Sequence, residues 1–443
     1  MKIVKIKDNS KYSENEFSEI PKITDKILNY TLGFLENDLF IFPEMLKNSE
    51  DIIKKQKILE TRNDNIHSTN IMGFIGCENE RLTIKSRFSN GENDWFFQYL
   101  LESVLNLPNV LKLNNEYNQD NNSLDLLMFL FPYYLKTAMR KGVFKTYIKN
   151  QYNDMNIKGI IDIPRHINKN IPFIGNVAYN KREFSYDNYI TELIRHTIEF
   201  IKKEKYGQIL LRQVKDEVEI VVNSTNNYQF FDRKNFLIEN KKNPLRHAYY
   251  HEYRTLQRLC IMILQYEKHQ IGYGNREING ILFDGAWLWE EYINLLLKDN
   301  FYHPKNKSKE GKQYLFNSTG EIYPDFISKN PENRIIADAK YKPKENIANK
   351  DYLQVLAYMF RFDAKTGIYI YPNDKEEKYE LMYINSGTTY ENNVTKNEDI
   401  SVIKLGLEIP KDIEDYKDFC VEIQRNEETF LKILENIFKK EKI

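Results

Sequence analysis

The chain has 443 residues, of which 41% are hydrophobic and 14% are aromatic, with 31 Tyr and 26 Phe. This composition predicts a globular protein of two or three domains and excludes a disordered chain. Lys plus Arg and Asp plus Glu each total 64, so the formal net charge is zero. Any contact with nucleic acid must therefore come from local basic patches, because no overall basic field attracts phosphate.

The three cysteines, Cys77, Cys260 and Cys420, lie far apart and form no C-x-x-C pair. They argue against a zinc site or a disulfide framework and in favour of a reducing cytoplasm. The seven His residues show no ligand spacing, and each is interpreted as a structural or surface residue. No apolar run has the length of a signal-peptide core or a membrane span, which predicts a soluble cytoplasmic protein with no membrane partner.

The first half of the chain predicts a mixed α/β region. Short strands and helices are expected over residues 1–60, a hairpin over 71–88, and a helix over 95–105. An Asn-rich stretch predicts a surface loop over 114–122, with a break between two subdomains near 115–122.

Three further elements are expected before the first candidate catalytic residues in the sequence. A helix is predicted over 124–149, and a strand that enters a turn is predicted over 156–167. A second helix is predicted over 192–203, with Ser185 or Asp187 as its cap. The later turns of the first helix carry a basic run: Lys136, Arg140, Lys141, Lys145 and Lys149. This run contacts DNA or a partner, or it forms a solvated surface, and both interpretations stay open.

All visible chemistry lies beyond residue 285, so we divide the chain into an N-terminal region over 1–245 and a C-terminal domain over 246–443. A helix over 249–268 is expected to lead into the second part. The pattern G-x-x-x-x-G-K-[ST] is absent, so this chain is not expected to bind a nucleotide through a P-loop.

The segment 334–340 has the composition of a strand. A period of two places Asp338 and Lys340 on one face and three apolar residues on the other, so one face is expected to be dry and the other to carry chemistry. Asp325 arrives from a preceding strand expected over 323–327. Two carboxylates are hard oxygen ligands for Mg2+, and a Lys beside them can orient or help to deprotonate an attacking water. The pattern predicts metal-dependent phosphodiester hydrolysis, whereas an Asp-x-Lys alone is also typical of a solvated strand face.

Two helices flank these strands. Gln354 and Tyr358 stand at i and i+4 on one face of a helix expected over 351–360. Glu290 and Glu291 interrupt an apolar helix over 287–297. The alternatives are the polar edge of an amphipathic helix for the first pair and a helix surface for the second. The chain then predicts strands over 367–372, 378–384 and 401–408 and a closing helix over 416–440.

The order helix, strand, strand, helix, strand resembles the core of the PD-(D/E)xK nuclease superfamily, and Gln-x-x-x-Tyr resembles the signature of RecB-like nucleases. The resemblance implies an α/β fold. Its C-terminal nuclease core would be a mixed central sheet flanked by helices, and a mixed α/β region would precede it as a partner-docking part.

Most of the chain resembles the McrC-like, LlaJI-type subunits of restriction systems. The resemblance rests on the nuclease motifs and on the segments 73–76, 86–88, 131–136, 158–167 and 184–188. It implies an N-terminal region that docks on a hexameric McrB-like AAA+ GTPase and stimulates its GTP hydrolysis, and a nuclease that cuts double-stranded DNA. The target, modified cytosine or an unmodified site guarded by methylation, stays open.

Residue by residue, the resemblance implies that Asp325 and Asp338 are metal ligands, joined by the Ala339 carbonyl, and that Lys340 is the catalytic lysine. Glu290 matches the extra helix acid of the family. Its neighbour Glu291 is the lesser candidate, because on a helix of 3.6 residues per turn it points about 100 degrees away from Glu290. The expected cofactor is Mg2+, with Mn2+ as a substitute. Two alternatives to the endonuclease subunit are a self-sufficient RecB-like exonuclease and a non-catalytic adaptor of the GTPase.

Overall fold

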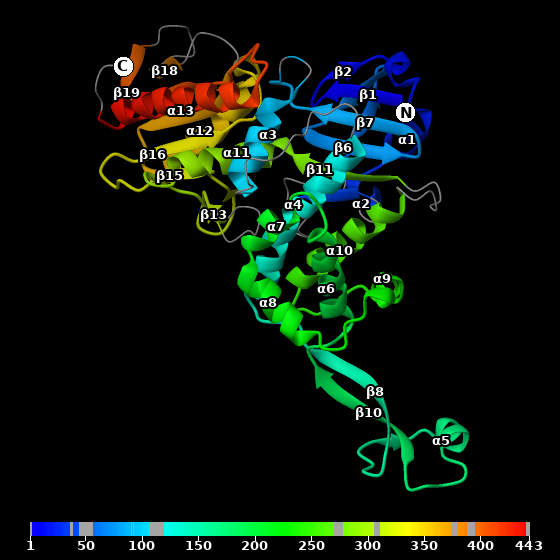
Figure 1. Ribbon diagram of the computed structural model, residues 1–443. Coiled ribbons are helices and arrows are strands. Elements are labelled where there is room, and N and C mark those ends of the chain that lie inside the picture. Colours follow the sequence, from blue (N-terminus) through cyan, green and yellow to red (C-terminus); the bar gives the residue numbers. More distant parts are fainter. Residues whose placement is uncertain are drawn as a thin grey trace. The chain divides into compact units, whose positions relative to one another are not determined.

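The structure is a computed structural model that describes residues 2–35, 39–43, 56–89, 91, 93–105, 119–269, 278–304, 311–373, 379–387 and 395–439. The chain forms two compact units. Unit 1 combines residues 1–123 with residues 276–443, and unit 2 consists of residues 124–275. The chain therefore begins in unit 1, forms unit 2 and returns to unit 1 (Figure 1).

The first sheet of unit 1 has five strands in the order β1-β7-β6-β11-β3. Their bounds are Lys2–Lys7 for β1, Leu39–Phe42 for β3, Ile71–Cys77 for β6, Glu80–Lys85 for β7 and Asn279–Asp284 for β11. The antiparallel pair β6 and β7 confirms the predicted hairpin. Strand β11 lies inside this sheet, antiparallel to β6 and parallel to β3, although it comes from the second half of the chain.

The position of β11 explains why the compact units do not follow the predicted boundary at residue 245. Its main chain bonds to strands on both sides, so residues 1–245 alone would leave β6 and β3 without the strand between them. Strands β6 and β11 lie close together at Gly73 of β6. A Cβ atom at this position would stand 2.2 Å from the main-chain oxygen of Ile281 in β11. The other boundary, after Ser123, lies next to the break expected near 115–122, of which residues 115–118 are outside the described residues.

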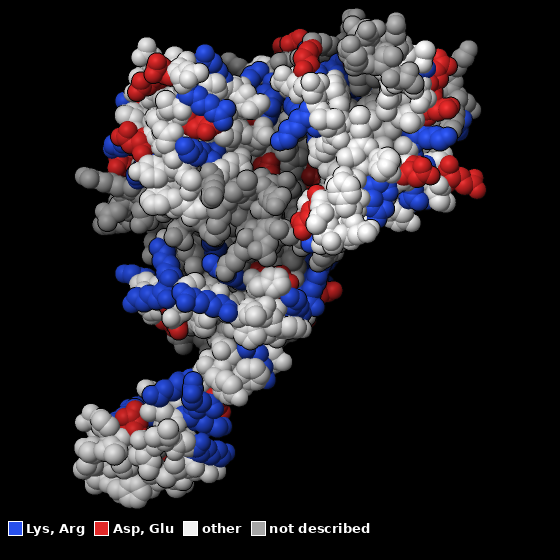
Figure 2. Space-filling view, turned by 180° about the vertical axis from the view of Figure 1, so that it is seen from behind, with Lys and Arg blue, Asp and Glu red and all other residues white. Residues whose placement is uncertain are grey.

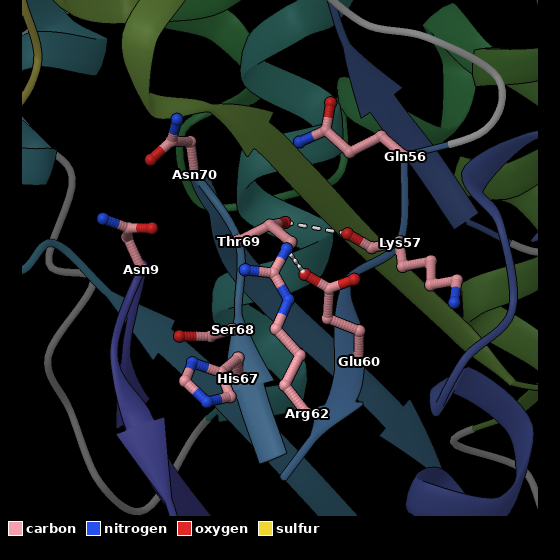
Figure 3. Close-up of a pocket in the computed structure, with 9 residues that line it drawn as sticks. All are labelled: Asn9, Gln56, Lys57, Glu60, Arg62, His67, Ser68, Thr69 and Asn70. Carbon is pink, nitrogen blue, oxygen red and sulfur yellow. Dashed lines mark hydrogen bonds and ion pairs between the residues drawn. The ribbon is translucent and has the colours of Figure 1, made fainter. Parts of the chain in front are cut away.

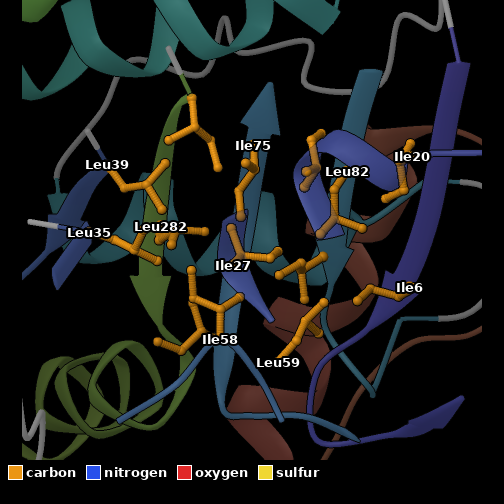
Figure 4. Close-up of a cluster of buried hydrophobic side chains, with 14 of the residues drawn as sticks. Ile6, Ile20, Ile27, Leu35, Leu39, Ile58, Leu59, Ile75, Leu82 and Leu282 are labelled. Carbon is orange, nitrogen blue, oxygen red and sulfur yellow. The ribbon is translucent and has the colours of Figure 1, made fainter. Parts of the chain in front are cut away.

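The core of this part lies on one face of the five-stranded sheet (Figure 4). Helix α1 (Pro21–Ile27), helix α2 (Leu32–Leu35) and strand β4 (Leu59–Arg62) supply isoleucines and leucines that pack against the sheet. Leu282 of β11 belongs to the same cluster, so both segments of unit 1 contribute residues to one core. A smaller sheet in the order β2-β5-β4 adds β2 (Lys11–Tyr12) and β5 (Asn65–Ser68).

The second sheet of unit 1 has six strands in the order β12-β15-β16-β17-β19-β18. Their bounds are Phe301–Tyr302 for β12, Phe326–Ser328 for β15, Ile335–Ala339 for β16, Thr366–Asn373 for β17, Tyr379–Ser386 for β18 and Thr395–Glu408 for β19. Strands β16, β17 and β19 run parallel, while β15 and β18 are antiparallel to their neighbours. Helices α11 (Gly285–Leu297), α12 (Asn349–Phe362) and α13 (Tyr416–Lys439) pack against it. The predicted α/β fold with a mixed sheet flanked by helices is confirmed.

Helix α3 (Trp95–Leu105) has the predicted bounds and packs against α11 and α13. Between β12 and β15 the chain forms the short hairpin of β13 (Gln313–Tyr314) and β14 (Glu321–Ile322). The described helices include none that is long and apolar enough to cross a membrane.

Unit 2 is built around helix α6 (Tyr189–Ile201), which packs against its neighbours in a helical bundle. The surrounding helices are α4 (Gln119–Met139), α7 (Gly207–Arg212), α8 (Lys215–Ser224), α9 (Arg233–Lys242) and α10 (Glu252–His269). From the bundle extends a long antiparallel ribbon of β8 (Thr146–Asp154) and β10 (Val177–Ser185) (Figure 1). The far end of the ribbon carries β9 (Ile160–Ile161) and α5 (Ile163–Lys169). We call residues 146–185 the arm.

Three predictions for this region were wrong. The helix expected over 124–149 ends at Met139, because Gly142 adopts a φ of +87° and the β-forming residues from Thr146 onward pair with β10. The strand and turn expected over 156–167 become the two-residue strand β9 followed by helix α5, because Asp162 caps α5 and accepts a hydrogen bond from Arg165 N. The stretch 119–122, expected as part of a loop, has helical backbone at the start of α4.

The cap of α6 also differs from the prediction. The side chain of Asn188 accepts hydrogen bonds from Ile190 N and Thr191 N, whereas Ser185 and Asp187 were expected to cap the helix. The reason is the register: the helix begins at Tyr189, three residues before the predicted start, so Asn188 is the residue that directly precedes it.

Candidate active site

Asp325 and Asp338 lie side by side because their strands pair. Phe326 of β15 faces Ala337 of β16 in an antiparallel register, so the next pair along this ladder brings Asp325 opposite Asp338. Asp325 precedes the first residue of β15, and its Oδ2 accepts a hydrogen bond of 2.9 Å from Ala339 N. The predicted pairing of the two acids from neighbouring strands is therefore present.

Asp338 is a buried carboxylate, with 1% of its surface exposed. Its Oδ2 lies 2.6 Å from Lys340 Nζ, and apart from this ion pair neither oxygen accepts a hydrogen bond from the described residues. Burial raises the pKa of Asp338, and the nearby Lys340 ammonium opposes that rise. Among the described residues, Oδ1 therefore lacks a donor of the kind that usually satisfies a buried carboxylate oxygen, and Oδ2 faces the Lys340 ammonium.

The face of β16 that carries Asp338 is as dry as the apolar face. Ile335, Ile336 and Ala337 are all fully buried, and Ile336, on the same face as Asp338, packs with α12 in a hydrophobic core. The reason is that β16 lies in the interior of the sheet, between β15 and β17, and helices cover it. The two acids consequently stand at the end of a dry strand.

Lys340 connects the acids to helix α12. Its Nζ donates a hydrogen bond of 3.0 Å to Gln354 Oε1, and Gln354 Nε2 donates one of 2.8 Å to the Tyr358 hydroxyl. The spacing of four residues places Gln354 and Tyr358 one above the other on α12. Asp338, Lys340, Gln354 and Tyr358 thus form one continuous polar chain, which decides against the alternative of an exposed helix edge.

The charge state of Lys340 follows from its surroundings. Burial alone would lower the pKa of Lys340, but the carboxylates of Asp338 and Asp325 outweigh burial and raise it above its ordinary value. In this arrangement the side chain stays protonated and acts as a hydrogen-bond donor and a positive charge.

The acids of α11 face the same site through His303. Its Nε2 lies 3.7 Å from Glu290 Oε1 and 3.8 Å from Glu291 Oε1. Its Nδ1 lies 2.9 Å from the main-chain oxygen of Asp325. Both glutamates therefore turn toward His303, although the helical geometry predicts that they diverge. Burial of Asp325 raises its pKa most, and the carboxylates of Asp338 and Glu290 raise it further, which puts Glu290 electrostatically beside the acid pair.

The donor set suits a hard divalent cation. Asp325 and Asp338 are close enough for each carboxylate to destabilise the charge of the other, and a bound cation would relieve both the repulsion and the missing donor at Asp338 Oδ1. Over the part of the chain that the structure describes, however, no three His, Cys, Asp or Glu side chains are gathered as a metal-binding cluster. Metal binding by Asp325, Asp338, the Ala339 carbonyl and Glu290 stays a prediction.

Two neighbours of this site escaped the sequence reasoning. His303 was grouped with the structural histidines, because its partners are distant in sequence. Asp351 is the third residue of helix α12, and its carboxylate accepts hydrogen bonds from Ala348 N at 3.0 Å and Lys342 Nζ at 2.6 Å. The Lys340 ammonium lies 3.8 Å from the same carboxylate. The position of an Asp in the first turn of a helix was a detectable signal.

The residue after Lys340 joins the site to the first sheet. The Tyr341 hydroxyl lies 2.7 Å from Ser86 Oγ, and the guanidinium of Arg87 lies 4.7 Å from the Tyr341 ring. Arg87 in turn pairs with Asp8, whose side chain is fully buried, at 2.6 Å. The motif at residues 86–88, which marked the family resemblance, therefore serves as a junction between the two sheets of unit 1.

A polar cavity of about 310 Å³ lies beside strands β4 and β5 of the small sheet (Figure 3). Its lining consists of polar residues, many of which bond to each other or to the main chain: Arg62 pairs with Glu60, and the Thr69 hydroxyl donates to the Lys57 carbonyl at 2.8 Å. Asn70 accepts a hydrogen bond from Arg87, so the cavity wall continues into the junction.

The arm of unit 2 is a second candidate functional surface. Its tip exposes large apolar side chains, with Ile160 82% and Ile174 76% exposed. The other members of this apolar tip are Met155, Ile157, Ile161, Ile163, Ile167, Ile171 and Phe173. Figure 2 shows basic residues toward the base of the arm and mostly uncharged residues at its end. Such a concentration of exposed apolar side chains is typical of a protein-binding surface.

The basic run predicted on one helix is divided between several elements. Lys141 pairs with Glu252 at 2.7 Å, and the Lys145 ammonium lies 4.5 Å from the Tyr186 ring. Lys149 belongs to β8 of the arm. Lys141 and Lys145 thus make contacts within unit 2, and the predicted contact of the run with DNA or a partner stays a prediction.

Comparison with known proteins identifies the family. A family model described as "McrBC 5-methylcytosine restriction system component" matches residues 66–372. The comparison with curated proteins returned no match. Among solved structures, a chain of a Thermococcus gammatolerans half-complex of McrB AAA+ hexamers with bound McrC is 14% identical, with a TM-score of 0.46, covering 96% of this chain and 99% of that chain.

A chain from the cryo-EM structure of the Thermococcus gammatolerans McrBC complex is 15% identical, with a TM-score of 0.29, covering 67% of this chain and 87% of that chain. The family match spans well over half of the sequence, including the hairpin of β6 and β7, the arm, both acids and α12. The chain therefore belongs to the family of McrBC 5-methylcytosine restriction system components.

Proposed function

We propose that this chain is the Mg2+-dependent DNA endonuclease subunit of a GTP-dependent restriction system. The observation that carries the proposal is that Asp325 and Asp338 lie side by side on adjacent strands, and that Lys340 and Gln354 connect Asp338 to helix α12. Membership in a restriction family makes DNA the expected substrate of such a site.

In the proposed mechanism Asp325, Asp338, the Ala339 carbonyl and Glu290 would hold Mg2+, with Mn2+ as a substitute. When bound, the ion polarises the scissile phosphate and makes the attacking water more acidic. Lys340 donates hydrogen bonds toward the water and the phosphate oxygens, and its positive charge stabilises the negative charge that develops there. Gln354 accepts from Lys340 and so orients its ammonium, while Tyr358 holds the Gln354 amide.

The proposed partner is a hexameric McrB-like AAA+ GTPase, and the apolar tip of the arm is the proposed contact. The similar solved structures are complexes of McrB with McrC, and they motivate this choice of partner. An exposed apolar surface of this kind gains free energy when a partner covers it, at about 25 cal/mol for each Å² buried. In this proposal docking stimulates GTP hydrolysis, and the target sequence and its methylation are read largely by the partner.

The experiment uses the purified full chain with its partner, GTP, Mg2+ and double-stranded DNA, both methylated and unmethylated. Asp338→Ala is expected to lower cleavage by at least about 100-fold because it removes a proposed metal ligand, while partner binding persists because the proposed contact is the arm of unit 2. Asp399→Ala is the matched control, since Asp399 is an exposed Asp on β19 of the same sheet.

Three other outcomes would contradict the proposal. Wild-type cleavage by Asp338→Ala would disprove the site. Degradation of linear DNA by the chain alone, without partner or GTP, would indicate a self-sufficient exonuclease. Stimulated GTP hydrolysis with no cleavage under any condition would indicate an adaptor.

A further inference from the structure

His303 lies between the two groups of acids. It follows strand β12, whose residues Phe301 and Tyr302 pair with Ser328 and Ile327 of β15. This register carries His303 past the end of the ladder to the level of Phe326, where the two rings stack with centroids 4.9 Å apart and planes at 24°. Since Phe326 is fully buried, the stacking holds the imidazole in one orientation.

Both ring nitrogens of His303 already face protein groups. A main-chain oxygen only accepts, so Nδ1 must donate its hydrogen to the Asp325 carbonyl at 2.9 Å. Nε2 faces the carboxylates of Glu290 and Glu291 at 3.7 and 3.8 Å. A hard cation such as Mg2+ prefers oxygen ligands, and Nε2 of His303 is directed at two carboxylates, so the contacts of His303 are with the acids.

We propose that His303 is a positioning residue of the nuclease site, which ties the Asp325 main chain to the Glu290 and Glu291 carboxylates and so sets the spacing of the acids that hold the metal. The inference rests on the proposed function. It assigns a role to a histidine that neither the motif nor its sequence spacing marks, and it explains why both glutamates turn the same way.

The physical basis is the mutual repulsion of the acids. Asp325 and Glu290 come from different elements, the start of β15 and helix α11, and two like charges that share a site tend to separate. The imidazole between them provides a hydrogen bond to the Asp325 main chain on one side and electrostatic contacts to the glutamates on the other. Partners of this kind, one step beyond the ligands, typically change metal affinity or activity by about 10–100-fold when they are removed.

The test measures cleavage by the full chain with its partner across a range of Mg2+ concentrations. His303→Phe keeps a ring to stack on Phe326 and removes both polar contacts. We expect the Mg2+ concentration for half-maximal cleavage to rise by about 10-fold or more, with much of the rate recovered at saturating Mg2+. A defect of packing alone would lower the rate at every Mg2+ concentration.

Two polar variants separate the two contacts. His303→Asn returns an amide donor near the position of Nδ1, and His303→Gln returns one near the position of Nε2. If both contacts matter, each variant recovers part of the Mg2+ response that His303→Phe loses. If His303→Phe does not fold, the Mg2+ response of His303→Asn and His303→Gln tests the role of His303 instead. His251→Phe is the matched control, because the His251 side chain is 66% exposed in unit 2.

The outcomes distinguish this inference from the proposed function. If Asp338→Ala is inactive while all three His303 variants keep the wild-type Mg2+ response, the nuclease assignment stands and the role of His303 is disproved. If Asp338→Ala itself cuts DNA normally, the proposed function fails first. Calorimetric titration with Mn2+ supplies a readout that is independent of cleavage, and unchanged affinity in His303→Phe would also overturn the inference.

Discussion

The hydroxyl oxygens of Tyr341 and Ser86 lie 2.7 Å apart in a buried hydrogen bond, although the two residues are separated by 255 positions. Tyr341 directly follows Lys340, and Ser86 follows the last residue of β7. The bond therefore joins the end of the strand that carries the site to the first sheet. The candidate nuclease is consequently not an independent C-terminal domain but part of a unit that includes both ends of the chain.

The first prediction concerns this junction. Tyr341→Phe and Ser86→Ala each remove one partner of the hydrogen bond, and each is expected to lower the free energy of unfolding of unit 1 by about 1–3 kcal/mol. Because both substitutions delete the same bond, the double variant should lose less than the sum of the single losses. Urea denaturation of the three variants measures the coupling, and strictly additive losses would contradict it.

A second prediction separates the roles of Lys340 and Asp338. Lys340→Ala should reduce cleavage strongly but leave Mn2+ affinity unchanged or higher, since removal of a positive charge favours a cation. Asp338→Ala should weaken Mn2+ binding by about 10-fold or more. Calorimetry of the two variants makes the comparison. If affinity collapsed in Lys340→Ala and survived in Asp338→Ala, the assigned roles would be reversed.

The third prediction orders the effects along α12. Gln354→Ala should lower the cleavage rate by about 10-fold, because Lys340 loses the acceptor that orients it, while Tyr358→Phe should cost less, because it acts only through the Gln354 amide. Single-turnover rates at saturating Mg2+ provide the measurement. Leu353→Ala is a control on the same helix, since Leu353 is 70% exposed. A larger defect in Tyr358→Phe than in Gln354→Ala would refute the proposed order.

The fourth prediction addresses the arm. Replacing Ile160 and Ile174 together by Ser should abolish most of the stimulation of the partner's GTP hydrolysis and leave the thermal stability of unit 2 unchanged, because both side chains are largely exposed. A matched control replaces Phe231, which is 90% exposed on the helical bundle, by Ser. Full stimulation by the Ile160 and Ile174 variant would rule out the tip as the docking surface.

The fifth prediction is a pH dependence of stability in unit 2. The pKa of Glu192 is raised from 4.5 to about 8. Burial is the largest cause, and a contact with Asp187 is the next. A raised pKa means that the stabilising contribution of this carboxyl is complete below pH 4.5 and is lost as the pH rises through 8.

Glu192→Gln should therefore stabilise unit 2 at pH 9 by on the order of a few kcal/mol and have little effect near pH 4. Thermal unfolding across this range tests the sign. Glu219→Gln provides a control on the exposed surface of α8. A stabilisation that was equal at all pH values would exclude titration of Glu192 as its cause.

Local pattern was sufficient for strands β15 to β19 of the second sheet and for the four residues of the polar chain, but it did not predict the two-residue strand β12. The alternation on β16 and the spacing of four on α12 are properties of neighbouring residues, so the sequence alone predicted Asp338 and Lys340 on one strand and Gln354 and Tyr358 on one helix face. The same local reasoning failed at Asn188 and at Gly142, where one residue shifts the start or the end of a helix.

Contacts between distant segments were decided by the tertiary structure. Strand β11 enters the first sheet, Tyr341 bonds to Ser86, and His303 reaches both Asp325 and the glutamates of α11. The burial of the second face of β16 has the same origin, because a strand becomes dry on both sides only when helices cover the assembled sheet. The sequence by itself therefore determined which chemical groups the site contains, while packing over long sequence separations decided which residues hold those groups in place.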